Sequence, residues 1–247
     1  AAADNMSKSV VISAVNTNTD LAADGLVQGT YKAYAVDADE NLSDASLDNV
    51  TIGGLVDIDG NVYRTVVIGT QNWMAENLKV TKYRNGDNIT NITTNSDWTS
   101  NTSGAYGVYN NDNTTYLDSY GLLYNWYAVD NSSSRYICPE GWHVPTTDEY
   151  DDLSTYLGGN LVAGGKMKET GTDHWNSPNT GADNETSSGF NARGGGLRYG
   201  GDGTYGNKKR YTWIWSGTSS GSNAYYRRLQ YNSADFNEYN GSKNNGF

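Results

Sequence analysis

The stretch that decides the fold is Cys138-Pro-Glu-Gly-Trp-His-Val-Pro-Thr-Thr-Asp-Glu-Tyr-Asp-Asp-Leu-Ser-Thr-Tyr-Leu-Gly-Gly159. Within it, Thr146 and Glu149 have the S/T-x-x-E spacing of a helix capping box. Tyr150, Leu153 and Leu157 then recur at positions that share one face of a helix. The two glycines at the end of the stretch predict where the helix stops. The stretch therefore predicts one amphipathic helix over residues 146–157, preceded by an irregular segment.

Strand patterns lie on both sides of this helix. Residues 56–63 alternate apolar and polar side chains around Asp59-Gly-Asn61, which predicts a hairpin. Residues 211–215 and 224–231 predict two more strands, separated by glycine-rich loops. The chain therefore indicates an α+β fold with few regular elements.

Between the hairpin and the helix, the sequence gives weaker signals. Residues 84–119 hold Asn, Thr, Ser and Asp with few aliphatic side chains, which predicts long loops with one ordered island at 106–109. A short helix is predicted where apolar residues recur at helical spacing, at Leu122, Leu123, Trp126 and Tyr127.

A change of pattern near residue 53 predicts two domains. Before it, residues 9–15, 29–36 and 48–52 have strand patterns, too few for an independent sandwich. This segment resembles the last part of an immunoglobulin-like bacterial repeat, so residues 1–53 are expected to be a partial β stalk. Gly53-Gly54 predicts a short hinge, and residues 54–247 are expected to form the second domain.

Composition restricts the function. The chain has 17 basic and 28 acidic residues and a formal charge of −11, which argues against nucleic-acid binding and against charge-driven membrane binding. It has no apolar run long enough to cross a bilayer. The 20 tyrosines and 7 tryptophans, with abundant Asn, Ser, Thr and Gly, are typical of a secreted or surface-displayed protein. Cys138 is the only cysteine, so this sequence allows no internal disulfide.

Ordered sequence blocks carry a family resemblance. They are Asp57-Ile-Asp-Gly-Asn-Val-Tyr63, Ile68-Gly-Thr-Gln-Asn-Trp-Met-Ala-Glu-Asn-Leu78, Tyr120-Gly-Leu-Leu-Tyr-Asn-Trp-Tyr127, Cys138-Pro-Glu-Gly-Trp-His-Val-Pro145, Gly189-Phe-Asn-Ala192, Trp215-Ser-Gly-Thr218 and Asn223-Ala-Tyr-Tyr-Arg-Arg-Leu229. In this order they resemble the Fibrobacter succinogenes major paralogous domain of bacterial surface and secreted proteins. That family is similar to the formylglycine-generating-enzyme version of the C-type lectin fold. The resemblance implies a compact α+β domain with a loop-built binding face.

The resemblance also implies a departure at the end of the chain. Family members continue past the Gly246-Phe247 pair into a final strand with a second cysteine, which would pair with Cys138. We therefore expect either a longer natural chain or a sheet edge that another molecule completes. The N-terminus, which has no signal-peptide pattern, is likewise expected to be a cut or processed end.

Catalytic and metal-binding patterns are weak. Formylglycine-type oxygen chemistry needs more cysteine than Cys138 alone. His143 is expected to be a core histidine bonded to backbone, and His174 a solvated loop residue, so neither predicts a nucleophile with its base. The carboxylates of residues 148–152 suit the N-terminal turn of a helix better than glycoside hydrolysis. The sequence therefore predicts a protein that is not an enzyme.

Among metal ions, calcium fits the oxygen-rich turns of this sequence best. Asp37-Ala-Asp-Glu-Asn-Leu-Ser43 places oxygen atoms at alternate positions, but Leu42 stands where calcium loops carry glycine. Asp57, Asp59 and Asn61 are explained by the hairpin turn. No cofactor is therefore expected, and calcium remains only an alternative.

The predicted binding surface lies near the C-terminus. Along 225–231, Tyr225, Arg227, Leu229 and Tyr231 share one face of a strand, and the presence of Leu229 marks that face as the buried one. Tyr and Arg are the side chains that binding surfaces favour, and Asn adds adaptable hydrogen bonds. The predicted ligand-contacting residues are Tyr226, Arg228, Gln230, Asn232 and Tyr239, with Trp98 and Tyr109 as rings that could stack on a sugar. Trp126, Trp213 and Trp215 are expected in the core.

These observations predict an extracellular binding or adhesion module for a protein or carbohydrate ligand, displayed on a bacterial surface, a secreted assembly or a phage particle. No nucleic-acid partner and no membrane insertion are expected. The alternative is a structural subunit of a filament, in which chains self-associate by strand exchange.

Overall fold

The computed structural model describes residues 29–32, 49–52, 55–183 and 188–247, and the chain divides into two compact units, residues 1–55 and 56–247. In the first unit, β1 (Gly29–Lys32) pairs antiparallel with β2 (Asn49–Ile52), and Gly29 lies opposite Ile52. The remainder of the expected stalk, including the strand over 9–15 and the Asp37–Ser43 turn, lies outside the described residues. The immunoglobulin-like character of this unit stays a prediction.

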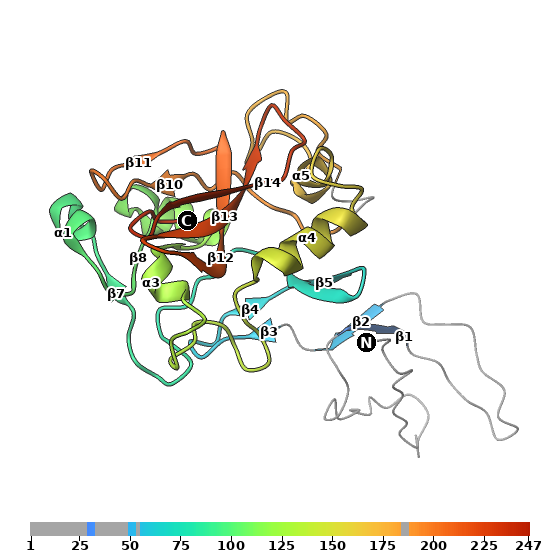
Figure 1. The fold of residues 1–247 in the computed structure, drawn as a ribbon. Coiled ribbons are helices and arrows are strands. Elements are labelled where there is room, and N and C mark those ends of the chain that lie inside the picture. Colours follow the sequence, from blue (N-terminus) through green and yellow to red (C-terminus); the bar gives the residue numbers. More distant parts are fainter. Residues whose placement is uncertain (1–28, 33–48, 53–54, 184–187) are drawn as a thin grey trace, which may run out of the picture. The chain divides into compact units, whose positions relative to one another are not determined.

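The second unit is a mixed α+β structure made of several small sheets (Figure 1). Its largest described sheet is antiparallel, in the order β12-β13-β14, with bounds Tyr211–Ser220, Asn223–Gln230 and Asn237–Ser242. A second three-stranded sheet joins β7 (Thr90–Asn91), β8 (Ala105–Gly107) and β9 (Leu123–Tyr124). Two-stranded pairs are β3 (Leu55–Val56) with β4 (Val62–Tyr63), β5 (Thr65–Ile68) with β6 (Gln71–Met74), and β10 (Leu197–Arg198) with β11 (Tyr205–Gly206). The predicted hairpin at 56–63 and the strands at 211–215 and 224–231 are confirmed.

The predicted helix is α4 (Thr147–Tyr156), and its capping box is confirmed. The Thr146 side chain accepts from the Glu149 N–H at 3.3 Å, and the Thr146 N–H donates to the Glu149 carboxylate at 2.8 Å. Gly158 and Gly159 end the helix with φ of 103° and 96°, a conformation that glycine adopts without strain. The other helices are α1 (Asn95–Ser100), η1 (Tyr109–Asn111), α2 (Asn113–Tyr120), α3 (Trp126–Val129) and α5 (Ala163–Met167).

Two predictions for the middle of the chain were wrong. Residues 84–119 are not long loops, because they contain β7, α1, β8, η1 and α2, although the ordered island predicted at 106–109 does coincide with β8 and the start of η1. Asp112 caps α2 by accepting from the Thr115 N–H at 3.0 Å. The polar composition of the segment does not distinguish such a helix cap from a loop. The helix expected from Leu122 begins only at Trp126, because Leu123 and Tyr124 pair with β8 and Asn125 caps the short helix.

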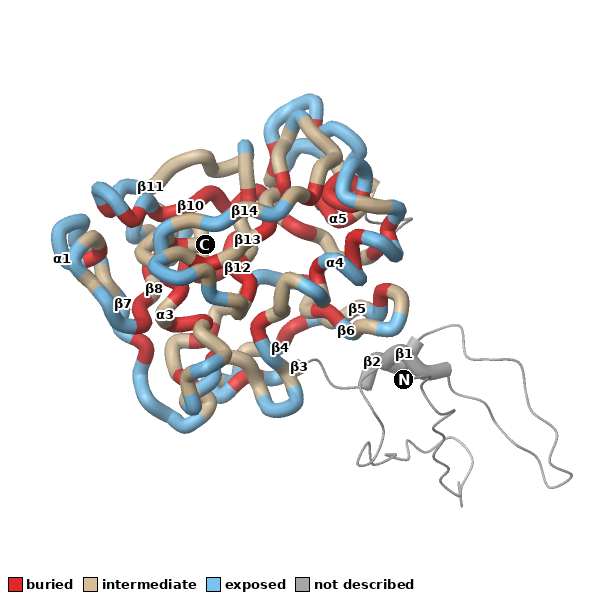
Figure 2. Tube along the Cα trace, in the orientation of Figure 1, coloured by how far each residue is buried: buried red, intermediate tan, exposed pale blue. Residues whose placement is uncertain are grey.

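The core consists of two clusters that include residues of the main sheet (Figure 2). One contains Leu229 of β13 and packs it with Leu153 of α4 and Met167 of α5. The other contains Trp215 and the segments around Tyr124 and Trp126. Arg227 is 2% exposed, bonds to the Phe236 carbonyl at 3.1 Å and pairs with Asp151 of α4, so it ties the sheet to that helix. No helix among the described residues is long and apolar enough to span a membrane.

Candidate functional site

The most developed polar and aromatic surface lies on one face of the β12–β14 sheet. We call this set the aromatic face: Tyr211, Trp213, Tyr226, Arg228, Gln230 and Tyr239. The strand register brings its members together, because Tyr211 lies opposite Gln230, Trp213 opposite Arg228, and Tyr226 opposite Tyr239. Each of these side chains is half-buried, so each has one side packed and one side open.

Contacts within the aromatic face hold Arg228 between tyrosines. Its guanidinium lies 4.5 Å from the Tyr239 ring centroid and 5.3 Å from that of Tyr211, and Nη2 donates to the Tyr239 hydroxyl at 3.0 Å. Tyr226 stacks on Tyr239 with ring centroids 5.7 Å apart and planes at 21°. Burial raises the pKa of Tyr226, although Arg228 partly offsets the shift. The charge of Arg228 has no acidic partner among the described residues, so it remains free to meet an anionic or polar ligand.

The predicted contact residues fall into three groups. Tyr226, Arg228 and Tyr239 come together, while Gln230 lies beyond them and its amide bonds to exposed Asn232. The prediction that Leu229 marks the buried face is confirmed, since Leu229 is 0% exposed. Tyr109 lies in a different cluster, described below. Tyr211 and Trp213 were missed as surface residues, because they share a strand face with Trp215, which is 4% exposed.

Two tryptophan predictions need correction. Trp98 is 1% exposed and packs under the Arg198 guanidinium at 4.4 Å, so its ring is not available to a sugar. Trp98 is the buried residue of α1, a helix that the sequence pattern did not predict. Trp213 was expected in the core together with Trp126 and Trp215. It is half-buried, whereas the other two are 4% exposed.

Tyr109 belongs to a second aromatic surface, which we call the tyrosine cluster and which consists of Tyr109, Tyr116, Tyr120 and Tyr205. Neighbouring ring centroids along it lie between 5.3 and 6.3 Å apart. The Lys208 ammonium lies 4.1 Å from the centroid of Tyr116, 5.8 Å from Tyr109 and 5.9 Å from Tyr120. The loop sequence gave no sign that Lys208 meets residues almost 100 positions earlier.

An apolar groove of about 540 Å³ runs beside the free edge of β12. Its lining includes Trp73, Leu122, Ile137, Cys138 and Trp215, together with Phe247, whose ring lies 4.2 Å from that of Trp215.

The edge of β12 faces this groove with unused backbone groups. The Tyr211 carbonyl accepts from Gly196 on the side away from β13. Backbone groups alternate along a strand, so Trp213 and Trp215 present theirs to the same side. Within the described residues, the Trp213 carbonyl and the Trp215 N–H have no backbone partner there. The groove therefore combines apolar walls with an open strand edge.

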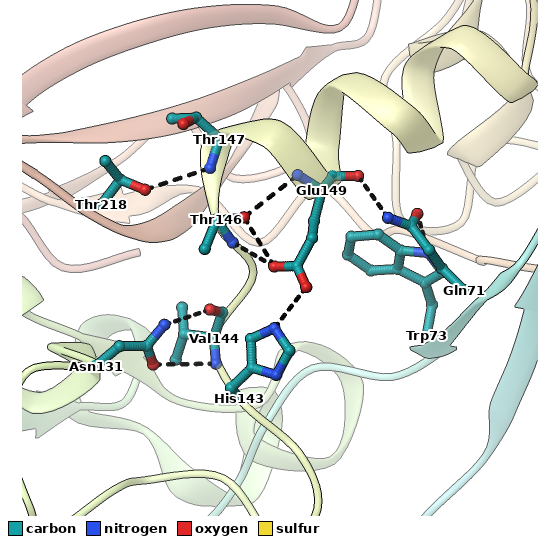
Figure 3. Close-up of polar contacts among 9 residues, drawn as sticks. All are labelled: Gln71, Trp73, Asn131, His143, Val144, Thr146, Thr147, Glu149 and Thr218. Carbon is teal, nitrogen blue, oxygen red and sulfur yellow. Dashed lines mark hydrogen bonds and ion pairs between the residues drawn. The ribbon is translucent and has the colours of Figure 1, made fainter. Parts of the chain in front are cut away.

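His143 and Glu149 are polar residues in the lining of the groove, and Figure 3 shows the contact between their side chains. The expectation that His143 is a core residue was wrong: its side chain is 54% exposed, and Nε2 lies 2.7 Å from Oε1 of Glu149. Figure 3 shows that Gln71 donates to the Glu149 carbonyl at 3.1 Å and that Asn131 bonds to both backbone groups of Val144. His143 therefore extends the helix cap.

Cys138, His174 and Asp57 were the other candidate residues for catalysis or metal binding. Burial raises the pKa of the Cys138 thiol to about 12, so the thiol is protonated at neutral pH. His174, expected in solvent, is 21% exposed and lies 2.5 Å from Glu169 Oε2, which also pairs with Arg193. Over the described ranges, no three His, Cys, Asp or Glu side chains gather as a metal site requires. Asp57 accepts from the Tyr63 hydroxyl at 2.6 Å and from two backbone N–H groups, as the hairpin turn predicted.

The fold and these surfaces define a mixed α+β domain with an apolar groove and two aromatic surfaces, whose side chains are half-buried except for Tyr120, which is 7% exposed. Comparison with protein families matches residues 66–245 to the Fibrobacter succinogenes major domain. The match covers more than half of the chain, and the chain belongs to that family. No curated protein and no solved structure matches it.

Proposed function

We propose that this protein is an extracellular binding or adhesion module whose aromatic face contacts a protein or carbohydrate ligand. The supporting observation is the arrangement of Arg228 between Tyr211 and Tyr239, where a charged group with no acidic partner among the described residues lies between two rings. Aromatic side chains and arginine supply much of the affinity at binding surfaces, and the aromatic ones lose little conformational entropy on contact.

The proposal includes the architecture and setting of the protein. We place the second unit in the C-type lectin-like class, with the first unit as its immunoglobulin-like stalk, on a bacterial surface, in a secreted assembly or on a phage particle. The family membership supports this setting. We also propose that it is not an enzyme: the Cys138 thiol is held protonated, and His143 is engaged by a helix-cap carboxylate.

A binding experiment on an array tests the aromatic face. The wild-type chain and an Arg228→Ala/Tyr239→Ala variant would be applied to an array of glycans and extracellular matrix proteins. We expect the variant to lose about 100-fold or more in affinity for the ligand that the wild type selects. The matched control is Arg64→Ala/Tyr156→Ala, which removes the same residue types from exposed positions outside the face. Equal binding by both variants, or no wild-type binding on the array, would contradict the proposal.

The groove supports a second function, a structural subunit completed by strand exchange between chains. Extended segments add to exposed sheet edges through backbone hydrogen bonds, while side-chain pockets select their sequence. Both requirements are present where β12 borders the groove. The native mass in solution tests this function, since strand exchange predicts a concentration-dependent series of oligomers.

A further inference from the structure

The turn between β11 and β12 carries a concentration of positive charge. Asn207-Lys208-Lys209-Arg210 contains the only three consecutive basic residues in a chain with a formal charge of −11. Among the described residues, none of the three has an ion pair with an acid. Elsewhere in the described fold, Lys82, Arg193 and Arg227 do have acidic partners. The turn is therefore a local cationic surface whose charge is not neutralised by an acidic side chain among the described residues.

The backbone of this turn fixes where its side chains point. Asn207 and Lys209 both have a φ of 62°, the left-handed region that lysine rarely adopts. Between them, Lys208 turns toward the tyrosine cluster and places its ammonium 4.1 Å from the Tyr116 centroid. Arg210 is fully on the surface. Lys208 is thus held against aromatic rings, the Lys209 ammonium donates to the Thr172 carbonyl at 3.4 Å, and Arg210 lies in solvent.

Hydrogen-bonding groups surround the same rings. The Tyr205 hydroxyl donates to Asn111 at 2.9 Å, and the Asn207 amide donates to the Tyr199 hydroxyl at 2.8 Å. These bonds orient the rings, and Asn111, whose amide also donates to the Thr93 carbonyl at 3.0 Å, lies exposed beside them. Tyrosine rings offer apolar surface to the C–H face of a sugar, and asparagine amides bond to its hydroxyls. Ammonium and guanidinium groups bind carboxylate or sulfate through charge-assisted hydrogen bonds.

We propose that the Lys208–Arg210 turn and the tyrosine cluster form a binding site for a short acidic saccharide. This inference rests on the proposed binding function and names a ligand class for it. Rings, amides and cations together match the three kinds of group on a uronic acid oligosaccharide. A long polyanion such as single-stranded nucleic acid suits the site less well, because its phosphates would also meet the net negative charge of the rest of the chain.

Calorimetric titration with tetragalacturonate tests this site, and its fully methyl-esterified form serves as the neutral probe. We expect the ester to bind at least about tenfold more weakly, because it keeps the sugar faces but loses the carboxylates. Lys209→Met/Arg210→Gln should weaken binding of the acid by a similar factor and reduce its salt dependence. The matched control is Lys166→Met/Arg64→Gln, which removes one lysine and one arginine at positions distant in sequence from the turn. This control should leave binding unchanged.

Several results would overturn the assignment. They are equal binding of acid and ester, equal losses in the turn variant and the control, and tighter binding of a single-stranded DNA oligonucleotide than of tetragalacturonate. If the wild type binds neither galacturonate but captures another ligand through Arg228 and Tyr239, this site is wrong and the proposed function stands. If acidic saccharide binding depends on the turn and survives Arg228→Ala/Tyr239→Ala, the aromatic face is wrong and this site stands.

Discussion

The imidazole Nε2 of His143 lies 2.7 Å from Oε1 of Glu149, while the other carboxylate oxygen of Glu149 accepts from Thr146. One carboxylate therefore closes the α4 capping box and contacts His143 in the lining of the groove. Burial tends to raise the pKa of Glu149, but the hydrogen bonds from Thr146 and His143 outweigh it and lower the pKa below its usual value.

Replacing Glu149 should expose this dual role. Glu149→Ala should lower the free energy of unfolding at pH 7 by about 1 kcal/mol, the usual loss for a removed cap. A carboxylate with a lowered folded-state pKa stabilises the fold above its unfolded value of about 4.5. That stabilisation is lost as the pH falls through the folded pKa, so the gap between wild type and variant should shrink from pH 6 to pH 3. Urea unfolding across this range measures it.

Asp152→Asn is the matched control for the cap, because Asp152 is an exposed acid on the same helix. It should change the free energy of unfolding little at any of these pH values. A Glu149→Ala variant that is as stable as the wild type at pH 7 would contradict the assigned role of the cap.

Lys168 should show a pH dependence of the same sign in the alkaline range. Its side chain is buried, and Nζ donates to the carbonyls of Thr180, Gln230 and Ser233 at 2.8–2.9 Å. Burial lowers its pKa to about 8 from 10.5 in the unfolded chain. Between these values the unfolded state binds more protons than the folded state, so this residue makes stability rise with pH.

Lys168→Met measures both parts of that effect. At pH 7 the variant should lose about 1–3 kcal/mol, because buried carbonyls lose their donor. From pH 8 to pH 10 the wild type should gain stability relative to the variant, which isolates Lys168 from the other groups that titrate there. A constant difference over this range would show that Lys168 keeps an ordinary pKa in the fold.

A third prediction concerns the hairpin that opens the second unit. The Tyr63 hydroxyl donates to the buried Asp57 carboxylate and accepts from the Lys79 N–H at 2.9 Å. Tyr63→Phe removes both bonds without changing the packing of the ring, so unfolding should become easier by about 1–3 kcal/mol. Chemical denaturation measures the loss, and Tyr156→Phe, at a 65% exposed position, should be neutral. Equal effects in the two variants would contradict the role of this hydroxyl.

Local patterns in the sequence predicted part of this structure well. The α4 cap, its Gly158 stop and the buried side of Leu229 depend on residues close in the chain, so their spacing was enough. Trp98 was misplaced because its burial depends on a distant segment, whereas His143 was misplaced although its partner Glu149 lies only six residues away. Arg198 covers the tryptophan, while His143 reaches a carboxylate on the following helix. The tyrosine cluster joins residues 109–120 to Lys208, and no short-range pattern encodes such a contact.

The last prediction uses Cys138 as a reporter for the groove. Burial raises the pKa of its thiol to about 12, so at pH 8 almost no reactive thiolate is present in the folded chain. Iodoacetamide should therefore label Cys138 at least about 100-fold more slowly in buffer than in denaturant, as read by intact-protein mass spectrometry.

Protein concentration then separates a binding module from a strand-exchanging subunit. Cys138 lines the groove beside β12, so a strand inserted from a second chain would cover the thiol and slow its labelling further as protein concentration rises. A Ser132→Cys/Cys138→Ala variant, with its thiol at an exposed loop position, should label at the same rate throughout. If the labelling rate of Cys138, like that of the variant, does not change with protein concentration and the protein stays monomeric, strand exchange is excluded. The proposed ligand binding by the aromatic face then remains. If only Cys138 becomes protected, neighbouring chains fill the groove and the structural function takes precedence.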